Sequence, residues 1–254
     1  MQTAKQKLKR AAPWLFLLLV LAGLAAVRGL AANYEIGYEI MNGDFQNYNP
    51  VRHLLAGQVP YRDFTVYLGA GELYSVGGLL LVLGNSFGRS MFATNFCTWF
   101  YFELLVLAVC LVVIGTARAA RAAALALCSV FFAYVQGANL PFAGQVNTLL
   151  SYAAANGNSA RMMRSAALTL AVLVILLGLH FWQQDTSRRL LAPAVLVPFA
   201  AGFFVPWSND MGGAAYISIA LGYGLYLIRL YRSSIGKIVV QTLRYIVTSV
   251  VGLG

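Results

Sequence analysis

The chain has 254 residues, of which 60% are hydrophobic and only 10% charged, and its net charge is +10. Soluble domains carry roughly 25% charged residues, so the composition argues against a water-soluble enzyme, a disordered chain and a disulfide scaffold. Several apolar stretches have the roughly 20 residues that a helix needs to span a bilayer. We therefore predict an all-α polytopic integral membrane protein in which residues 1–254 form a single membrane domain.

Most of the positive charge lies at the ends of the apolar stretches. Four basic residues precede the first stretch, within residues 5–10, and most others occupy short connectors. This bias orients membrane helices, so it argues against a nucleic-acid partner. It predicts an uncleaved signal anchor with a cytoplasmic N-terminus. Cys97, Cys110 and Cys128 lie in apolar stretches without the paired spacing of a metal site, and we expect them to be buried packing residues.

About seven stretches are predicted to cross the membrane as helices: 12–32, 91–115, 122–137, 165–183, 190–206, 213–230 and 237–254. A further apolar stretch, 66–84, contains several glycines and Glu72. If it lies along the outer surface as an interfacial helix, every arginine-rich connector falls on the inner side, as the positive-inside rule requires.

This topology places residues 33–90 in a long first outer loop and residues 138–164 in a second outer loop. Six of the eight acidic residues then lie on the outer side, which suggests a functional outer surface. Glu103 is the one acid within a predicted crossing, and Arg28 is expected to snorkel outward from the end of the first one.

The first outer loop carries the most informative residues. We expect a short helix to end at His53–Gly57, with Gly57 at its C-cap and with Asn49–Pro50 as the turn before it. An acid after the first crossing, this short helix, the segment G-Q-V-P-Y-R-D-F and a glycine-rich apolar stretch follow in order. This arrangement resembles the first outer loop of C-type (GT-C) membrane glycosyltransferases, in particular bacterial relatives of the dolichyl-phosphate-mannose mannosyltransferases and aminoarabinose transferases.

The resemblance implies a transfer of sugar from a polyprenyl-phosphate donor to an envelope or lipid-linked acceptor, at the outer face of a bacterial inner membrane. Asp44 matches the family's first-loop acid, taken there as a general base or an aid to metal binding, and Asp63 matches the acid of the Pro-Tyr-Arg-Asp segment. Both are therefore candidate catalytic residues. Alternatively, Asp44 caps a helix over 45–56, and Asp63 pairs with Arg62 or caps a helix over 64–84.

A lipid-phosphate donor needs cations near the interface, and arginine binds phosphate through two hydrogen bonds. Candidate sugar-contacting groups lie in the same loops, where a tryptophan ring can stack on a sugar and a carboxylate can accept from its hydroxyls. The candidate substrate-binding residues are Arg52, His53, Tyr61, Arg62, Arg161, Arg164, Trp207 and Asp210. Alternatively, Arg161 and Arg164 anchor to lipid headgroups, Trp207 belongs to an interfacial aromatic belt, and Asp210 caps a helix.

The second outer loop lacks the acid that many family members carry there. We therefore expect no metal-ligating residues and no cofactor, with a divalent metal at the first-loop acids as the alternative. The missing acid also leaves an alternative function open, that of a non-catalytic flippase or assembly subunit of envelope polysaccharide synthesis. The expected partners are a polyprenyl-phosphate-linked sugar, membrane lipids and a glycan or lipid acceptor.

Overall fold

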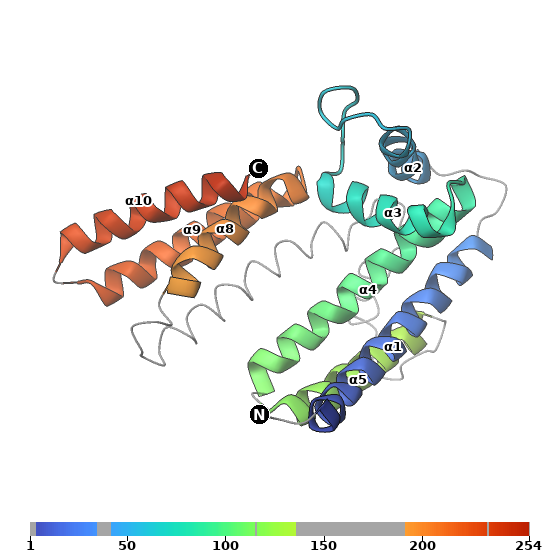
Figure 1. Cartoon of the computed structure of the whole chain (residues 1–254), viewed down its shortest axis with the longest axis horizontal. Coiled ribbons are helices and arrows are strands. Elements are labelled where there is room, and N and C mark those ends of the chain that lie inside the picture. The colour runs from blue at the N-terminus through green and yellow to red at the C-terminus, as the bar shows by residue number, and fades with distance from the viewer. Residues whose placement is uncertain (1–3, 35–41, 115, 136–190, 233, 254) are drawn as a thin grey trace.

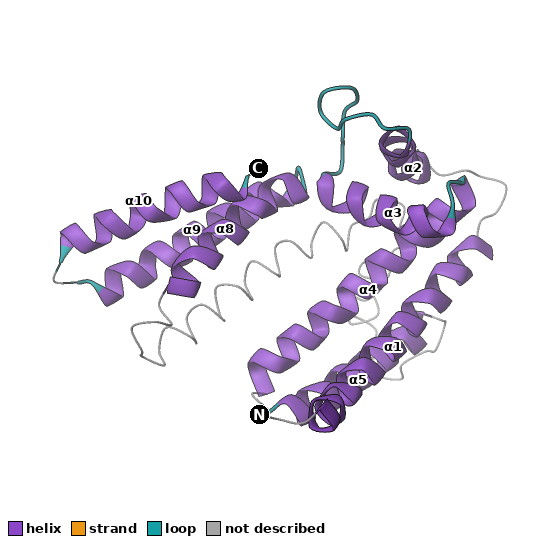
Figure 2. Cartoon of the chain, in the orientation of Figure 1, coloured by secondary structure: helices purple, strands orange, loops and turns teal. Residues whose placement is uncertain are grey.

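A computed structural model describes residues 4–34, 42–114, 116–135, 191–232 and 234–253. Within these ranges the structure contains eight helices and no strand. Figure 2 shows these helices connected by loops and turns. The predicted all-α class is thus confirmed for the described residues. The predicted crossing 165–183, a predicted helix at 142–155, and both Arg161 and Arg164 lie outside them.

Three helices form the N-terminal group: α1 (Ala4–Tyr34), α4 (Phe87–Ile114) and α5 (Ala117–Val135). Their shared core contains Leu17, Leu21, Leu107, Cys110 and Cys128. All three cysteines are free and buried, as the sequence predicted. In Figure 1 these helices run side by side along one diagonal.

Two shorter helices cover the end of this group at which α4 begins. These are α2 (Asn42–Leu55) and α3 (Ala70–Leu83), and Figure 1 shows α3 lying crosswise to α4. Val51 of α2 is fully buried, and Gly77 of α3 leaves room for the Leu54 side chain. Leu73 and Val76 of α3 join the same core.

The C-terminal group contains α8 (Leu191–Trp207), α9 (Met211–Leu230) and α10 (Ile235–Gly252). Helices α8 and α10 approach each other so closely that a Cβ atom at Gly202 would strike the Ser249 carbonyl, and one at Gly252 would strike the Phe199 carbonyl. Glycines at such positions let two helix backbones touch, which is a common way for membrane helices to pack.

Four described helices are long and apolar enough to cross a membrane: Ala11–Leu30, Phe87–Ile114, Met211–Leu230 and Ile235–Gly252. They correspond to four of the predicted crossings and support an integral membrane protein. Two other predicted crossings, 122–137 and 190–206, match α5 and α8, which are not among these four. Helix α5 carries Arg118 and Arg121 in its first turns, and the described apolar part of α8 covers only Val197–Trp207.

Three local predictions were wrong. Pro50 lies inside α2 rather than in a turn before a helix. Residues 66–69 precede α3 and are not helical, so this helix is shorter than the predicted 66–84. Arg28 does not snorkel outward: it is only 3% exposed, and its guanidinium carbon lies 5.9 Å from the centre of the Trp99 ring.

The close packing of α8 on α10 generates a stability prediction. Gly202→Ala places a methyl group against backbone atoms that cannot move aside, and such overpacking costs about 1–3 kcal/mol. Gly224 of α9 also lies inside a helix but has open space around it, so Gly224→Ala is the matched control and gains helix propensity. Thermal unfolding in detergent measures both variants. A Gly202→Ala protein as stable as the Gly224→Ala protein would contradict the packing.

Candidate functional site

A pocket of about 530 Å³ opens between α2 and the segment before α3. Its lining combines three aromatic rings with amide, hydroxyl and guanidinium groups. The lining residues are Phe45, Gln46, Tyr48, Asn49, Pro50, Arg52, Thr65 and Tyr67. Small-molecule sites in proteins typically have this size and this mixture of apolar walls with a few polar groups.

Helix α2 supplies one wall of the pocket and is fixed to the start of α4. The Phe45 ring stacks on Phe87 with centroids 4.9 Å apart, and the Tyr48 ring meets the same Phe87 edge-on at 5.7 Å. The Tyr48 hydroxyl donates to Oδ1 of Asn85 at 3.0 Å. On the same helix, Nη2 of Arg52 donates to Oδ1 of Asn49 at 3.0 Å. Two of the aromatic rings are therefore held in place before any ligand arrives.

The segment Thr65–Gly69 supplies the other wall. Its side chains alternate, with Val66 and Leu68 buried in the core and Thr65 and Tyr67 exposed toward the pocket. The segment ends at Gly69, whose φ of 109° disfavours any residue with a Cβ atom. The buried Val66 and Leu68 side chains thus anchor this segment to the core on either side of Tyr67.

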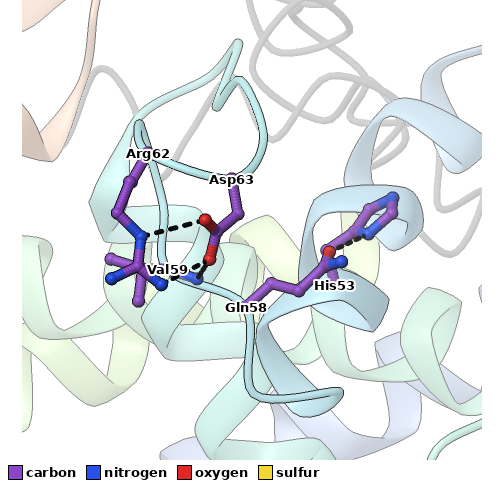
Figure 3. Close-up of polar contacts among 5 residues, drawn as sticks. All are labelled: His53, Gln58, Val59, Arg62 and Asp63. Carbon is purple, nitrogen blue, oxygen red and sulfur yellow. Dashed lines mark hydrogen bonds and ion pairs between the residues drawn. The ribbon is translucent and has the colours of Figure 1, made fainter.

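The loop between α2 and this segment is closed by Asp63, as Figure 3 shows. Its carboxylate accepts from Nε and Nη2 of Arg62, both at 2.9 Å, and from the Val59 amide at 2.8 Å. The Asp63 amide in turn donates to the Val59 carbonyl at 2.9 Å. The Arg62 guanidinium and the Val59 amide lower the pKa of Asp63 below its ordinary 3.8.

His53 also holds this loop and does not line the pocket. Its Nδ1 is hydrogen-bonded to Oε1 of Gln58, as Figure 3 shows, and its ring stacks on Phe64 with centroids 5.3 Å apart. Gly57 has a φ of 82° just after α2 ends, which agrees with its predicted place beyond the helix C-terminus.

Two further candidate residues, Tyr61 and Trp207, lie where the loop meets the turn between α8 and α9. Tyr61 has the uncommon φ of 63°, and its hydroxyl donates to Oδ1 of Asn209 at 3.2 Å. Partial burial raises the pKa of Tyr61 above its ordinary 10.0. Trp207 packs against Gly71 of α3 and meets the Tyr101 ring edge-on at 5.8 Å. Its indole is therefore a packing group between α3, α4 and α8.

The predicted helix caps differ from those in the structure. Asp44 is the third residue of α2, so it does not precede a helix over 45–56. Asp63 does not cap α3, which begins seven residues later at Ala70. Asp210 precedes α9 without a capping hydrogen bond; instead Oγ of Ser208 accepts from the Met211 amide at 3.3 Å and donates to Asp210.

The site brings together only part of the predicted set. Arg52 lines the pocket, and Asp44 directly precedes Phe45 of its wall. Arg62, Asp63 and His53 hold the adjacent loop. Among the described residues, no group of three His, Cys, Asp or Glu side chains is placed to hold a metal ion.

Sequence reasoning missed the aromatic wall and Asn209. A signal for the wall was present, because Phe45, Tyr48, Asn49 and Arg52 have the i, i+3, i+4, i+7 spacing of one helical face. Because a turn was predicted at Asn49–Pro50, these four residues were not assigned to one helix. No local pattern indicates Asn209, whose contacts lie more than 140 residues away along the chain.

No family model, no curated protein and no solved structure matches this chain.

The Asp63 contacts predict a specific titration. Because the folded-state pKa is lowered, the stabilisation from Asp63 is present above its ordinary pKa and is lost as the pH falls through the folded-state value. Arg62→Gln removes the largest cause, so the Asp63 midpoint should rise toward 3.8.

Carbon-13 NMR of aspartate-labelled protein in detergent micelles measures this midpoint, with the Asp63 signal assigned by its loss in Asp63→Asn. Arg52→Gln is the matched control, because Arg52 donates to Asn49 rather than to Asp63. An Asp63 midpoint that is the same in the Arg62→Gln protein and the parent would refute the contact.

Proposed function

We propose that this chain is a membrane glycosyltransferase of the C type. It moves a sugar from a polyprenyl-phosphate donor to an envelope or lipid-linked acceptor at the outer face of a bacterial inner membrane. The observation that carries the proposal is the aromatic and amide-lined pocket on α2, directly after the acid that resembles the family's first-loop acid.

The chemistry of the pocket suits a sugar. A pyranose or furanose ring has C–H groups that pack on aromatic faces and hydroxyl groups that need partners with both donors and acceptors. Phe45, Tyr48 and Tyr67 supply the aromatic surface. Gln46, Asn49 and Thr65 supply amide and hydroxyl groups, each of which can donate and accept. The volume of about 530 Å³ accommodates one sugar with its phosphate.

The reaction needs a base for the acceptor and a cation for the departing phosphate. In the proposed step the carboxylate of Asp44 takes the proton of the acceptor hydroxyl. The hydroxyl oxygen then bonds to the anomeric carbon of the sugar, and the bond from that carbon to the phosphate oxygen breaks. Arg52 neutralises the polyprenyl phosphate that leaves. Arg161 and Arg164, outside the described residues, remain candidate phosphate ligands in this proposal.

The two loop acids differ in how well they suit the role of base. Asp63 already accepts three hydrogen bonds, and its pKa is lowered, both of which make it a weaker base. Asp44 lies in the first turn of α2, beside the pocket wall. We therefore assign the base to Asp44 and the closing of the loop to Asp63.

One observation favours the alternative of a flippase subunit. Glu103 is almost completely buried and lies in the middle part of α4, a helix long enough to cross the membrane. Ionisable groups at such depth are typical of proteins that move polar substrates across a bilayer. A flippase would relocate a labelled polyprenyl-phosphate sugar between leaflets without forming a glycosylated product.

The variant Asp44→Asn tests the proposed base. It keeps the side-chain shape and removes the proton acceptor, so the transfer rate should fall by about 100- to 10,000-fold. The assay follows radiolabelled polyprenyl-phosphate hexoses and pentoses in nanodiscs with an envelope extract as acceptor. Asp63→Asn is the matched control and should lose far less activity while its loop loosens. A fully active Asp44→Asn protein would end the assignment.

The placement of the pocket on the outer side is tested by thiol labelling. The native cysteines are buried, so a single new cysteine reports its own location. In inverted and right-side-out membrane vesicles, Gln58→Cys should react with an impermeant reagent from outside and Ala119→Cys from inside. Labelling of both from the same side would contradict the proposed topology.

A further inference from the structure

We infer that Asn209, in the turn between α8 and α9, is a positioning residue for the sugar pocket. This inference rests on the proposed function, because it concerns how the Thr65–Tyr67 wall of that pocket is held. Asn209 lines no part of the pocket itself. It acts on the far side of the wall, through the backbone.

The contacts of Asn209 all go to the loop and the wall. Its Nδ2 donates to the carbonyl of Val66 at 2.6 Å and to the carbonyl of Tyr67 at 3.0 Å. Its Oδ1 accepts from the Tyr61 hydroxyl at 3.2 Å. One amide side chain thus joins three points in residues 61–67, and its donor and acceptor are used at the same time.

The backbone of the Thr65–Tyr67 wall needs a hydrogen-bonding partner. Outside helices and sheets, backbone carbonyls are satisfied by side chains or by water. The described part of this chain contains no sheet, and its one isolated bridge joins Pro60 and Phe64. Nδ2 of Asn209 donates to the carbonyls of Val66 and Tyr67, so one side chain holds the backbone of two consecutive wall residues. Tyr67 itself is 67% exposed, so its orientation depends on its backbone more than on packing.

The turn that carries Asn209 is itself fixed. Oγ of Ser208, which is fully buried, accepts from the Met211 amide at 3.3 Å. The preceding residue, Trp207, contacts Gly71, and its carbonyl lies so close to Gly69 that an added Cβ would be 2.5 Å away. The amide of Asn209 is therefore presented to Val66 and Tyr67 from a rigid base, as a positioning role requires.

The test uses a reporter on the wall that does not depend on any ligand. A nitroxide attached at Thr65→Cys, in a background without the native cysteines, gives an electron paramagnetic resonance spectrum that reports backbone mobility. Asn209→Ala and the isosteric Asn209→Asp both remove the two amide donors, so each should mobilise the nitroxide. Tyr61→Phe is the matched control: it removes only the hydroxyl bond to Asn209 and leaves the spectrum unchanged.

Binding is measured in protein with Thr65 intact, using tritiated polyprenyl-phosphate glucose, mannose and arabinose as probes. Loss of two net hydrogen bonds that order the wall should weaken binding of the accepted probe about tenfold in Asn209→Asp. A Thr65 spectrum that stays immobile in both Asn209 variants would overturn the inference. A mobilised spectrum in a chain whose parent binds none of the probes would support the positioning role and overturn the proposed function.

Discussion

The close approach of residues 66–71 to the turn at Trp207–Asn209 is the constraint on which the site depends. Its hydrogen bonds join the N-terminal helices to the C-terminal group across more than 140 residues of sequence. Glycine is required at two points of this contact: Gly69, beside the Trp207 carbonyl, and Gly71, beneath the Trp207 indole. A side chain at either position would push the turn away and withdraw the Asn209 amide from the carbonyls of Val66 and Tyr67.

Helices of both groups fix the walls of the pocket. Phe87 at the start of α4 holds the α2 wall through its contacts with Phe45 and Tyr48. The opposite wall is held from α8 and α9, and α8 is in turn locked to α10 by the backbone contacts at Gly202. Both walls of the pocket are thus held by helices, and rigid support of this kind is what the proposed sugar site requires.

Composition and the periodicity of apolar residues predicted the helical class and four helices that are long and apolar enough to cross a membrane, because both features depend on local apolar patterning. They could not locate the pocket. Pro50 is a strong turn signal in sequence, but α2 accommodates it by packing Val51 and Leu54 on α3, so tertiary contacts overrode the local preference. Arg28 illustrates the same limit: its place near a helix end suggested solvent, whereas the neighbouring Trp99 ring gives it a buried partner surface. Contacts between residues far apart in the chain, such as that of Asn209 with Val66, produce no periodic pattern in the sequence.

The central claim is that a sugar binds between α2 and the Thr65–Tyr67 wall. Photocross-linking with a polyprenyl-phosphate hexose that carries a diazirine on the sugar tests it most directly, because peptide mapping by mass spectrometry reports where the sugar lies in the intact protein in nanodiscs. The account predicts cross-links within residues 45–52 and 65–67, which excess unlabelled donor abolishes. Specific cross-links confined to α9 and α10, with none on these two walls, would contradict it.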